Sequence, residues 1–170
     1  HIFVLEMFLI SSMVFPMIKV RRGLDLPISG APKQEIHDGP KTSQIAIIGS
    51  DFHGMKPTME VKVGDSVSKG QLLFTDKKNP GVRFTSPTSG TVVEINRGDR
   101  RVFQSLVIDI DGDAKETFPS FDADKLSTLS RQQVVDNLVN SGQWVGFKTR
   151  PYSKVPAIDN TPASIFVNAM

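Results

Sequence analysis

The segment 141–156, which reads Ser-Gly-Gln-Trp-Val-Gly-Phe-Lys-Thr-Arg-Pro-Tyr-Ser-Lys-Val-Pro, gathers the residues of this sequence best suited to bind a ligand. It contains the only tryptophan, Trp144, and the only tyrosine, close to Phe147, Lys148 and Arg150. An aromatic ring beside cationic side chains suits a flat ligand with polar edges, or the surface of a partner protein. The alternative is a packed loop between domains, in which Trp144 and Phe147 are core anchors.

Metal binding and acid–base catalysis have less support in the sequence. His37 and His53 lie in expected loops without HExxH or any other ligand spacing, and no carboxylate or nucleophile stands at a telling distance from either. The chain has no cysteine, which excludes disulfides, thiolate nucleophiles, cysteine-ligated zinc and iron–sulfur clusters on it. We therefore expect neither catalytic residues nor a metal site here.

A β-rich region from Lys56 to Gly112 must position the segment that follows it. Apolar and polar residues alternate in several short runs, which is typical of strands with one buried face. The residues expected to alternate are Met59, Val61 and Val63, then Val82 and Phe84, then Thr91, Val93 and Ile95, and finally Leu106, Ile108 and Ile110. Glycine tolerates the positive φ of tight turns, and the expected structural turns are Gly64, Asp65, Gly70, Pro80, Gly81, Gly90 and Gly98.

The region is built from two similar hairpin halves, one starting at Gly64-Asp65 and a looser one at Gly98-Asp99. Such a pair resembles the barrel-sandwich hybrid of biotinyl and lipoyl domains, which also serves as a plain structural module. The resemblance predicts a fold and leaves the function open. We expect an α+β chain that is mostly β: an unmodified barrel-sandwich hybrid, followed by the start of a truncated α/β domain.

Lipoyl domains carry a modified lysine between their two halves, where this chain has Asp76-Lys77-Lys78. That chemistry needs a lone lysine at the tip of a short hairpin. Here Asn79-Pro80-Gly81 lengthens and stiffens the turn, two lysines compete, and the Met-Lys-Met of biotin attachment is missing. A carrier domain modified at Lys77 or Lys78 is therefore the alternative to an unmodified turn.

The flanking regions supply the remaining elements. Residues 44–49 predict a short buried strand, and Ile18 with Val20 predicts an edge strand. Ser130 and Gln133 form a capping box, so we expect a helix with Val134, Val135, Leu138 and Val139 on one face, ending at Gly142. Phe118 and Phe121 are expected to anchor a loop, and residues 163–170 to form a buried strand. The expected domains are a leader outside the family (1–16), N-terminal strands and a wrapping segment (17–55), the barrel-sandwich module (56–115) and the start of an α/β domain (116–170).

Length and composition describe an ordinary globular chain. The 170 residues are 39% hydrophobic and 22% charged, with a net charge of +2 from 20 basic and 18 acidic residues. This balance offers no basic stripe of the kind that nucleic acid requires, so we expect no nucleic-acid partner. Residues 1–15 are apolar but too short to span a bilayer, are interrupted by Glu6, and lack the basic start of a signal peptide. We expect upstream sequence outside the fold, with a short membrane or subunit contact as the alternative.

A series of short segments resembles one family over residues 17–170, the A subunits of the bacterial Na+-translocating NADH:quinone oxidoreductases. No single motif is decisive, but their order and spacing make chance agreement improbable. The segments are Met17-Ile18-Lys19, Gly23-Leu24-Asp25-Leu26-Pro27-Ile28, Asp76-Lys77-Lys78-Asn79-Pro80-Gly81-Val82, Asn96-Arg97-Gly98, Gln104-Ser105, Ser141-Gly142-Gln143-Trp144, Thr149-Arg150-Pro151, Ser153-Lys154-Val155-Pro156-Ala157-Ile158 and Ile165-Phe166-Val167-Asn168-Ala169-Met170.

The resemblance implies a role within a translocase that passes electrons from NADH through flavins and an iron–sulfur centre to ubiquinone and pumps sodium. The A subunit is expected to be peripheral, at the cytoplasmic face of the inner membrane. It would bind no cofactor, while FMN, FAD, riboflavin and the iron–sulfur centre lie on partner subunits B to F. If a quinone or a partner touches this segment, the expected contacts are Trp144, Phe147, Lys148 and Arg150.

The family is also similar to the flavin- and NADH-binding subunit of respiratory complex I and to the C subunit of the Rnf complex. In those relatives a loop of the form Gly-x-Gly-Gly-x-Gly-Phe-Pro lets the backbone approach a flavin phosphate. The corresponding run here is residues 143–151, in which only Gly146 remains. Side chains at the other positions block close approach of the backbone, so we expect no FMN and no NADH on this chain. A third possible function, besides a cofactor-less subunit and a carrier domain, is an independent flavoenzyme, which would be yellow when purified; we expect a colourless protein.

Overall fold

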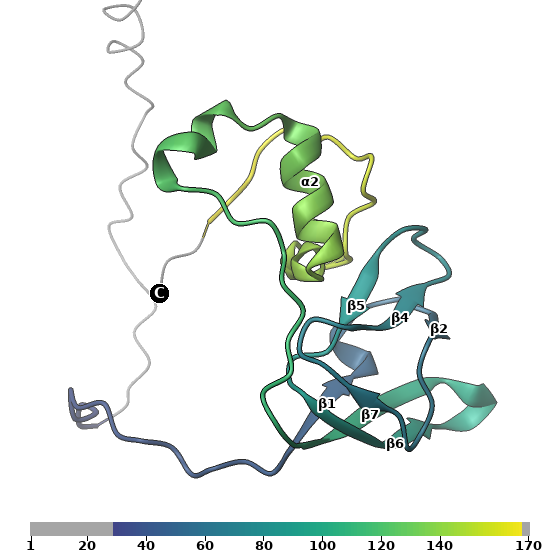
Figure 1. Ribbon diagram of the computed structural model, residues 1–170. Coiled ribbons are helices and arrows are strands. Elements are labelled where there is room, and N and C mark those ends of the chain that lie inside the picture. The colour runs from purple at the N-terminus through teal and green to yellow at the C-terminus, as the bar shows by residue number, and fades with distance from the viewer. Residues whose placement is uncertain (1–28, 168–170) are drawn as a thin grey trace, which may run out of the picture. The chain divides into compact units, whose positions relative to one another are not determined.

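The computed structural model describes residues 29–167, and the chain divides between Gly39 and Pro40. Residues 29–39 are exposed and contain no helix or strand. The second part contains every helix and strand of the described residues (Figure 1). In chain order, with η denoting a short 3-10 helix, these are β1 (Gln44–Ile48), η1 (Gly49–Asp51), β2 (Pro57–Met59), β3 (Ser66–Val67), β4 (Leu72–Asp76), β5 (Arg83–Thr85), β6 (Gly90–Arg97), η2 (Asp99–Arg101), β7 (Phe103–Ile110), η3 (Ala123–Thr128), α2 (Arg131–Asn140) and η4 (Gln143–Gly146).

The strands form two antiparallel sheets. One sheet has four strands in the order β1-β7-β6-β3, and the other has three in the order β2-β4-β5. The long β6–β7 hairpin is the main ladder of the first sheet, with Val92 opposite Ile108 and Ile95 opposite Leu106. Beyond the strands, the described residues contain the α-helix α2 and the short helices η3 and η4, which confirms the predicted mostly-β barrel-sandwich hybrid followed by the start of an α/β domain.

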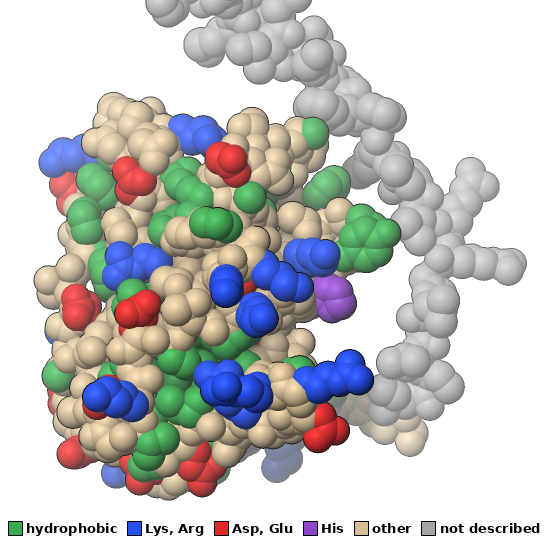
Figure 2. Space-filling model, turned by 90° about the vertical axis from the view of Figure 1, so that its right-hand side faces the viewer, with side chains coloured by type: hydrophobic (Ala, Val, Ile, Leu, Met, Phe, Trp, Pro, Cys, Tyr) green, Lys and Arg blue, Asp and Glu red, His purple; other side chains and the backbone are tan. Residues whose placement is uncertain are grey.

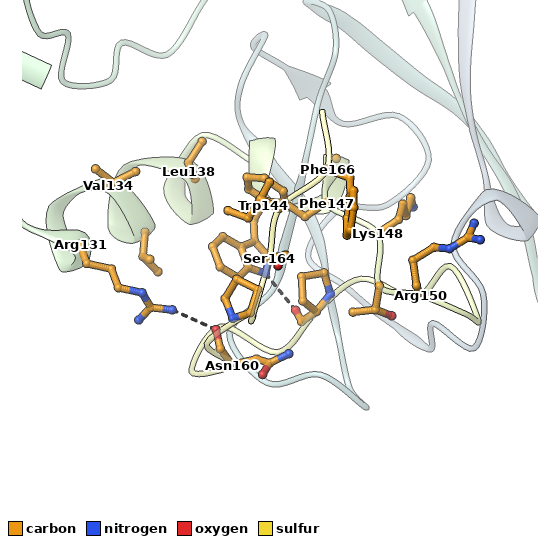
Figure 3. Close-up of a pocket in the computed structure, with 16 residues that line it drawn as sticks. Arg131, Val134, Leu138, Trp144, Phe147, Lys148, Arg150, Asn160, Ser164 and Phe166 are labelled. Atoms are coloured by element: carbon orange, nitrogen blue, oxygen red, sulfur yellow. Dashed lines mark hydrogen bonds between the residues drawn. The ribbon is translucent and has the colours of Figure 1, made fainter. Parts of the chain in front are cut away.

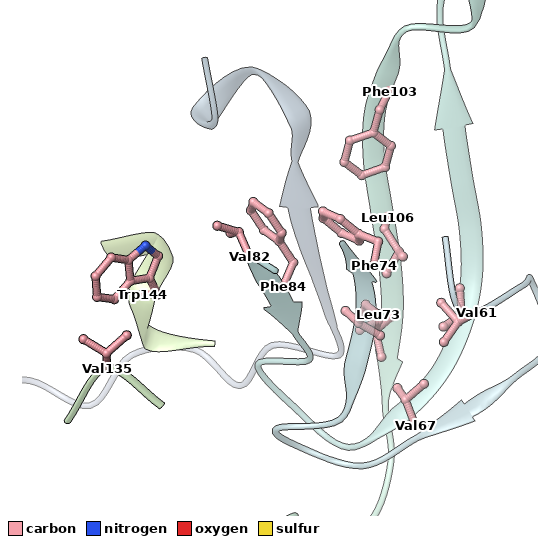
Figure 4. Packing of buried hydrophobic residues seen from close by; sticks show 12 residues of the cluster. Val61, Val67, Leu73, Phe74, Val82, Phe84, Phe103, Leu106, Val135 and Trp144 are labelled. Carbon is pink, nitrogen blue, oxygen red and sulfur yellow. The ribbon is translucent and has the colours of Figure 1, made fainter. Parts of the chain in front are cut away.

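Apolar side chains of both sheets meet in a shared core (Figure 4). Phe74 stacks on Phe84 at 4.6 Å between ring centroids and meets Phe103 edge-on at 5.3 Å. Aromatic pairs of this geometry stabilise a core beyond the burial of their area. The fully buried side chains are Leu73, Phe74, Val82, Val92, Leu106 and Ile108. Each contributes about 1.5–3 kcal/mol of hydrophobic stabilisation, so this cluster holds the two sheets together.

Three of the expected strand faces differ from the structure. Val63 is 58% exposed because β2 ends at Met59 and the chain then bends. In β6 it is Val92 that is fully buried, because a bulge between Val92 and Glu94 shifts the register and brings Ile95 back toward the core. A bulge inserts one residue into a ladder, which a strict two-residue period cannot anticipate. Ile110, at the end of β7, is 37% exposed.

The strand predicted at residues 44–49 exists as β1, but it is not buried. It lies at the edge of its sheet and pairs with β7 alone, Ile45 opposite Ile108. Ile45 and Ile48 are therefore about a third exposed or more, and only Ile47 is packed against the core. Edge position, which depends on the topology, is the reason that an apolar run remains open to solvent.

Most of the residues expected at turns lie at turns or bends, whereas Gly90 lies in a strand. Gly64 and Gly70 have φ values of 95° and 89°, at a turn closed from Asp65 N–H to the Lys62 carbonyl and at a bend before β4. Pro80 and Gly81 lie in the turn of residues 77–82 that connects β4 to β5. Gly90, expected in a loop, instead begins β6 and pairs with Val67 and Ile110. Gly98 is the residue before η2 at the tip of the β6–β7 hairpin.

Helix α2 begins and ends as predicted. Ser130 Oγ accepts from the Gln133 backbone N–H, and Gln133 Oε1 accepts from the Ser130 N–H, completing the capping box. Val135 is buried, whereas Val134, predicted on the same face, is 39% exposed because the packed stripe runs through Val135, Leu138 and Val139. Gly142 follows the helix with φ 75°.

The C-terminal strand prediction is wrong for the residues described. Ile165, Phe166 and Val167 form no strand and are exposed by 67%, 90% and 87%. A strand needs a neighbour to satisfy its backbone groups, and no described strand pairs with this segment. In the loop before η3, Phe118 is half-buried near Gly70, whereas Phe121 is exposed. The predicted leader and the edge strand at Ile18 and Val20 lie outside the described residues.

Within residues 29–167, no helix combines the length and the apolar character needed to cross a membrane.

Candidate functional site

The end of α2 fixes the position of the aromatic segment. Gly142 adopts the left-handed conformation and is buried against Thr85 of β5, whose hydroxyl donates to the Ser141 carbonyl at 3.1 Å. A Cβ on Gly142 would collide with the Thr85 side chain. Glycine therefore lets the chain turn directly against the sheet and enter η4, which carries Trp144.

Trp144 is the buried anchor of this segment. It is 7% exposed, and its indole Nε1–H donates to the Pro156 carbonyl at 2.9 Å. Phe147 meets the indole edge-on at 5.4 Å and is 39% exposed. A buried indole normally finds a partner for its N–H, and this one holds the returning chain. Trp144 is thus a core anchor, as expected for a packed loop between domains, whereas Phe147 presents a ring to solvent.

A pocket of about 740 Å³ opens over these two rings (Figure 3). All four residues singled out in the sequence line it, and Figure 3 shows Phe147 and Phe166 next to each other beside Trp144. Arg150 lies at the rim with its guanidinium pointing outward. The other walls come from α2 and from the C-terminal segment, and include Arg131, Val134, Leu138, Asn160, Ser164 and Phe166.

Lys148 joins the pocket to the barrel-sandwich module. Its Nζ lies 4.5 Å from the centroid of the Phe52 ring and 3.4 Å from the Asp51 carbonyl oxygen. Partial burial lowers the pKa of the Lys148 ammonium below its ordinary 10.5, and the Asp51 carboxylate raises this pKa in part. The ammonium is thus a cation held in place on an aromatic face.

Arg150 is placed by a compact turn. The Arg150-Pro151 peptide bond is cis, and backbone hydrogen bonds between Thr149 and Lys154 and between Ser153 and Thr149, both of 2.8 Å, close the turn. Tyr152 and Lys154 project from the same turn, with the Lys154 Nζ 6.0 Å from the Tyr152 ring centroid. These two side chains are exposed and do not line the pocket.

Two polar residues that frame the pocket were not predicted. Arg131 Nη2 donates to the Asn160 carbonyl at 2.9 Å. Asn79 Nδ2 donates to the Val155 and Pro156 carbonyls at 3.2 and 3.1 Å. The Pro156 oxygen therefore accepts hydrogen bonds from both Asn79 and Trp144. These bonds fasten residues 155–160 as a wall. They join positions up to 77 residues apart, and nothing in the local sequence marks them.

The Lys77-Lys78 turn is exposed at its side chains but held at its backbone. Buried Asp76 accepts through Oδ1 from the N–H of Lys56 at 3.0 Å and of Lys78 at 2.9 Å. The same turn is fastened to residues 155–156 through Asn79. A carrier lysine must be presented to a modifying ligase on a free tip, so this docked turn does not favour a swinging arm.

The histidines lie apart from the pocket. His37 Nε2 is 3.3 Å from Glu35 in an exposed stretch, and His53 lines a different hollow. Among residues 29–167, no three His, Cys, Asp or Glu side chains are grouped so as to hold a metal ion.

Two family models match the chain. Residues 18–111 match the N-terminal barrel-sandwich hybrid domain of NqrA, and residues 129–170 match the second alpha/beta domain of NqrA. Among similar proteins are the Na(+)-translocating NADH-quinone reductase subunits A of Hahella chejuensis, with 65% identity, Marinomonas sp., with 62%, and Saccharophagus degradans, with 61%. Each alignment covers 91% of this chain and 34–35% of the relative, so the chain spans about a third of their length. The chain belongs to the NqrA family, the A subunits of Na+-translocating NADH-quinone reductases.

Proposed function

We propose that the chain acts as part of a peripheral subunit of a sodium-translocating NADH:ubiquinone oxidoreductase, at the cytoplasmic face of the bacterial inner membrane. In this role it carries no cofactor and supports quinone reduction and assembly with subunits B to F. The family supports the assignment to such an enzyme. The role of this segment rests on the pocket over Trp144 and Phe147.

The pocket has the chemistry of a site for a flat, polar-edged ring. Phe147 offers an exposed aromatic face beside the buried Trp144. Arg150 supplies a cation at the rim, and Lys148 lines the same wall with its ammonium held on the Phe52 ring. A quinone head group stacks on an aromatic ring through its own plane and accepts hydrogen bonds through its two oxygens, which cationic donors strengthen. The arrangement therefore fits a quinone head group, with the ring against Phe147 and one oxygen toward the rim.

The shape of η4 supports the proposal that no flavin is bound by this segment. A flavin phosphate needs several bare backbone N–H groups in succession. Of the two glycines in residues 142–146, only Gly146 has open space at the position of a Cβ, since Gly142 is pressed against Thr85. Trp144, between them, is packed inward. FMN, FAD, riboflavin and the iron–sulfur centre would accordingly be held by the partner subunits.

The experiment is a titration of the assembled enzyme, containing the full-length subunit, with a quinone analogue. Replacing Phe147 and Arg150 together by Ala removes an exposed ring and a cation from the pocket. A hydrogen bond to a charged group is worth about 1.5–3 kcal/mol, so we expect a dissociation constant at least about tenfold higher. The matched control is Tyr152→Ala with Lys154→Ala, which removes an exposed ring and a cation outside the pocket. Unchanged affinity in the first variant, or equal loss in the control, contradicts the proposal.

A further inference from the structure

A second hollow, of about 920 Å³, lies on the barrel-sandwich module and plays no part in the proposed quinone contact. We call it the basic groove, because Lys56, Lys78, Arg97, Arg100 and Arg101 line it and no Asp or Glu does. Three stretches far apart in sequence form its walls: the loop after β1, the turn after β4 and the tip of the β6–β7 hairpin. Figure 2 shows the face of the molecule toward which this hairpin tip points, with Lys and Arg side chains gathered around hydrophobic ones.

No carboxylate of residues 29–167 forms an ion pair with the cations of the groove. Within residues 29–167 the ion pairs closer than 4 Å are Glu35–His37 and Asp122–Lys125, and neither involves the groove. Asp76, the acidic residue of the neighbouring turn, is buried and accepts from the backbone N–H groups of Lys56 and Lys78. Its carboxylate thus positions the two lysine backbones, and the side-chain charges remain directed to solvent. A concave surface lined by one sign of charge attracts the opposite sign.

The hairpin tip holds two of the arginines in a costly conformation. Arg100 and Arg101 have φ values of 54° and 61°, in the left-handed region that glycine and asparagine adopt most easily. Hydrogen bonds from Arg101 N–H to the Gly98 carbonyl and from Gly98 N–H to the Val102 carbonyl, of 3.0 and 2.8 Å, maintain this turn. Backbone strain of this kind clusters at functional sites such as ligand clamps.

The groove also offers apolar surface between its cations. Val102 is 63% exposed and Ile48 is 39% exposed, and both line the hollow with the half-buried Phe52. A small inorganic anion would leave this surface in water. A flat lipid surface would meet the rim alone, because the surface is hollowed. The groove thus combines concavity, cations without an ion pair among the described residues, and apolar side chains. This combination matches an extended peptide in which acidic and apolar residues are interspersed.

We propose that the basic groove binds an acidic, extended segment of a neighbouring subunit. Carboxylates of that segment pair with the arginines of the hairpin tip and with Lys56 and Lys78, while its apolar side chains cover Val102 and Ile48. The proposal rests on the proposed function, because it requires the chain to work within a multisubunit enzyme, and it assigns the contact that keeps the subunit in place.

The test measures how tightly the full-length subunit is retained by the other subunits as salt is raised. The variant combines Arg97→Gln, Arg100→Asn and Arg101→Asn, since asparagine accepts the left-handed backbone. Loss of three exposed ion pairs predicts a dissociation constant about tenfold higher at low salt, and a weaker salt dependence. The control, Lys62→Gln with Lys69→Gln and Lys115→Gln, removes three exposed cations outside the groove and leaves retention unchanged.

A second variant, Lys56→Gln with Lys78→Gln, leaves the hairpin tip intact and is expected to weaken retention in the same direction, so a folding defect of the first variant does not decide the result. Unchanged retention and salt dependence in both variants overturns the proposal, as does equal loss in the control. A parallel arm uses vesicles of anionic and of zwitterionic phospholipid. Loss of binding to anionic vesicles with unchanged retention by the subunits makes a lipid head group the occupant and also overturns it.

The failure of this proposal is distinguishable from that of the proposed function. Variants of the groove that leave the complex while Phe147 and Arg150 variants bind the quinone analogue normally support the groove and contradict the quinone contact. The reverse pattern supports the quinone contact alone.

Discussion

At the scale of single residues, the two rings of the aromatic segment differ in burial, since Trp144 is buried and Phe147 is exposed. Trp144 fixes the fold by bonding the Pro156 carbonyl, whereas Phe147 is left open beside it. The sequence shows both rings and the cations next to them, but it does not show which ring is turned inward. That choice depends on the Pro156 carbonyl, which is brought within reach of the indole by the returning chain.

Lys148 provides a prediction about protonation at this scale. Burial lowers its pKa and Asp51 raises it, so Asp51→Asn is expected to lower the pKa of Lys148 further. A titration of the labelled lysine side chain by NMR measures this change in pKa. A pKa that stays as in the unaltered chain, or rises, contradicts the assigned effect of Asp51.

The same shift determines how Lys148 affects stability. Its folded-state pKa is lower than its unfolded-state value of about 10.5, so the unfolded state binds more protons between the two values. The free energy of unfolding therefore rises with pH through that interval, and the charged ammonium costs stability below it. Lys148→Met is expected to remove this rise in a series of unfolding measurements at increasing pH.

At the scale of elements, the join between α2 and β5 controls the pocket. Gly142→Ala forces a side chain into the left-handed region and against Thr85. We expect a cost of about 1–2 kcal/mol for the backbone and about 1–3 kcal/mol for the clash. Hydrogen exchange in residues 131–147 of the full-length subunit is therefore expected to quicken.

Gly64→Ala is the matched control for this change. Gly64 also has a positive φ, 95°, but nothing lies within 4 Å of the position its Cβ would take. Gly64→Ala therefore has only the cost of the left-handed backbone, at a position remote from α2. Hydrogen exchange in residues 131–147 is expected to stay as in the unaltered chain. Equal protection of these amides in both variants contradicts the assigned role of Gly142.

The elements themselves were largely predictable where local chemistry decides them. The capping box of Ser130 and Gln133 and the helix end at Gly142 follow from a few neighbouring residues. The prediction failed where tertiary pairing decides: β1 is open because it is an edge, the bulge after Val92 changes which face is buried, and Ile165 to Val167 find no described strand to join. Strand pairing depends on distant partners, which periodicity does not contain.

At the scale of the whole molecule, the order of short segments along the sequence predicts the family, and the matches to both NqrA domains confirm it. The four candidate contacts do line one pocket. The bonds that frame it through Asn79 and Arg131 and the basic groove were not predicted, because each joins chain segments that only the fold brings together. The domain boundaries at 16, 55 and 115 stay predictions.

The central claim is that the pocket over Trp144 and Phe147 meets a quinone head group. Its most direct test is a cycle of affinities in the assembled enzyme, which compares a quinone with an analogue lacking one carbonyl oxygen, with and without Arg150→Ala. If Arg150 donates a hydrogen bond to that oxygen, removing both the oxygen and the Arg150 side chain lowers the affinity little more than removing either one. The two losses in binding free energy are then not additive. Fully additive losses, or no loss from Arg150→Ala with either ligand, would contradict the account.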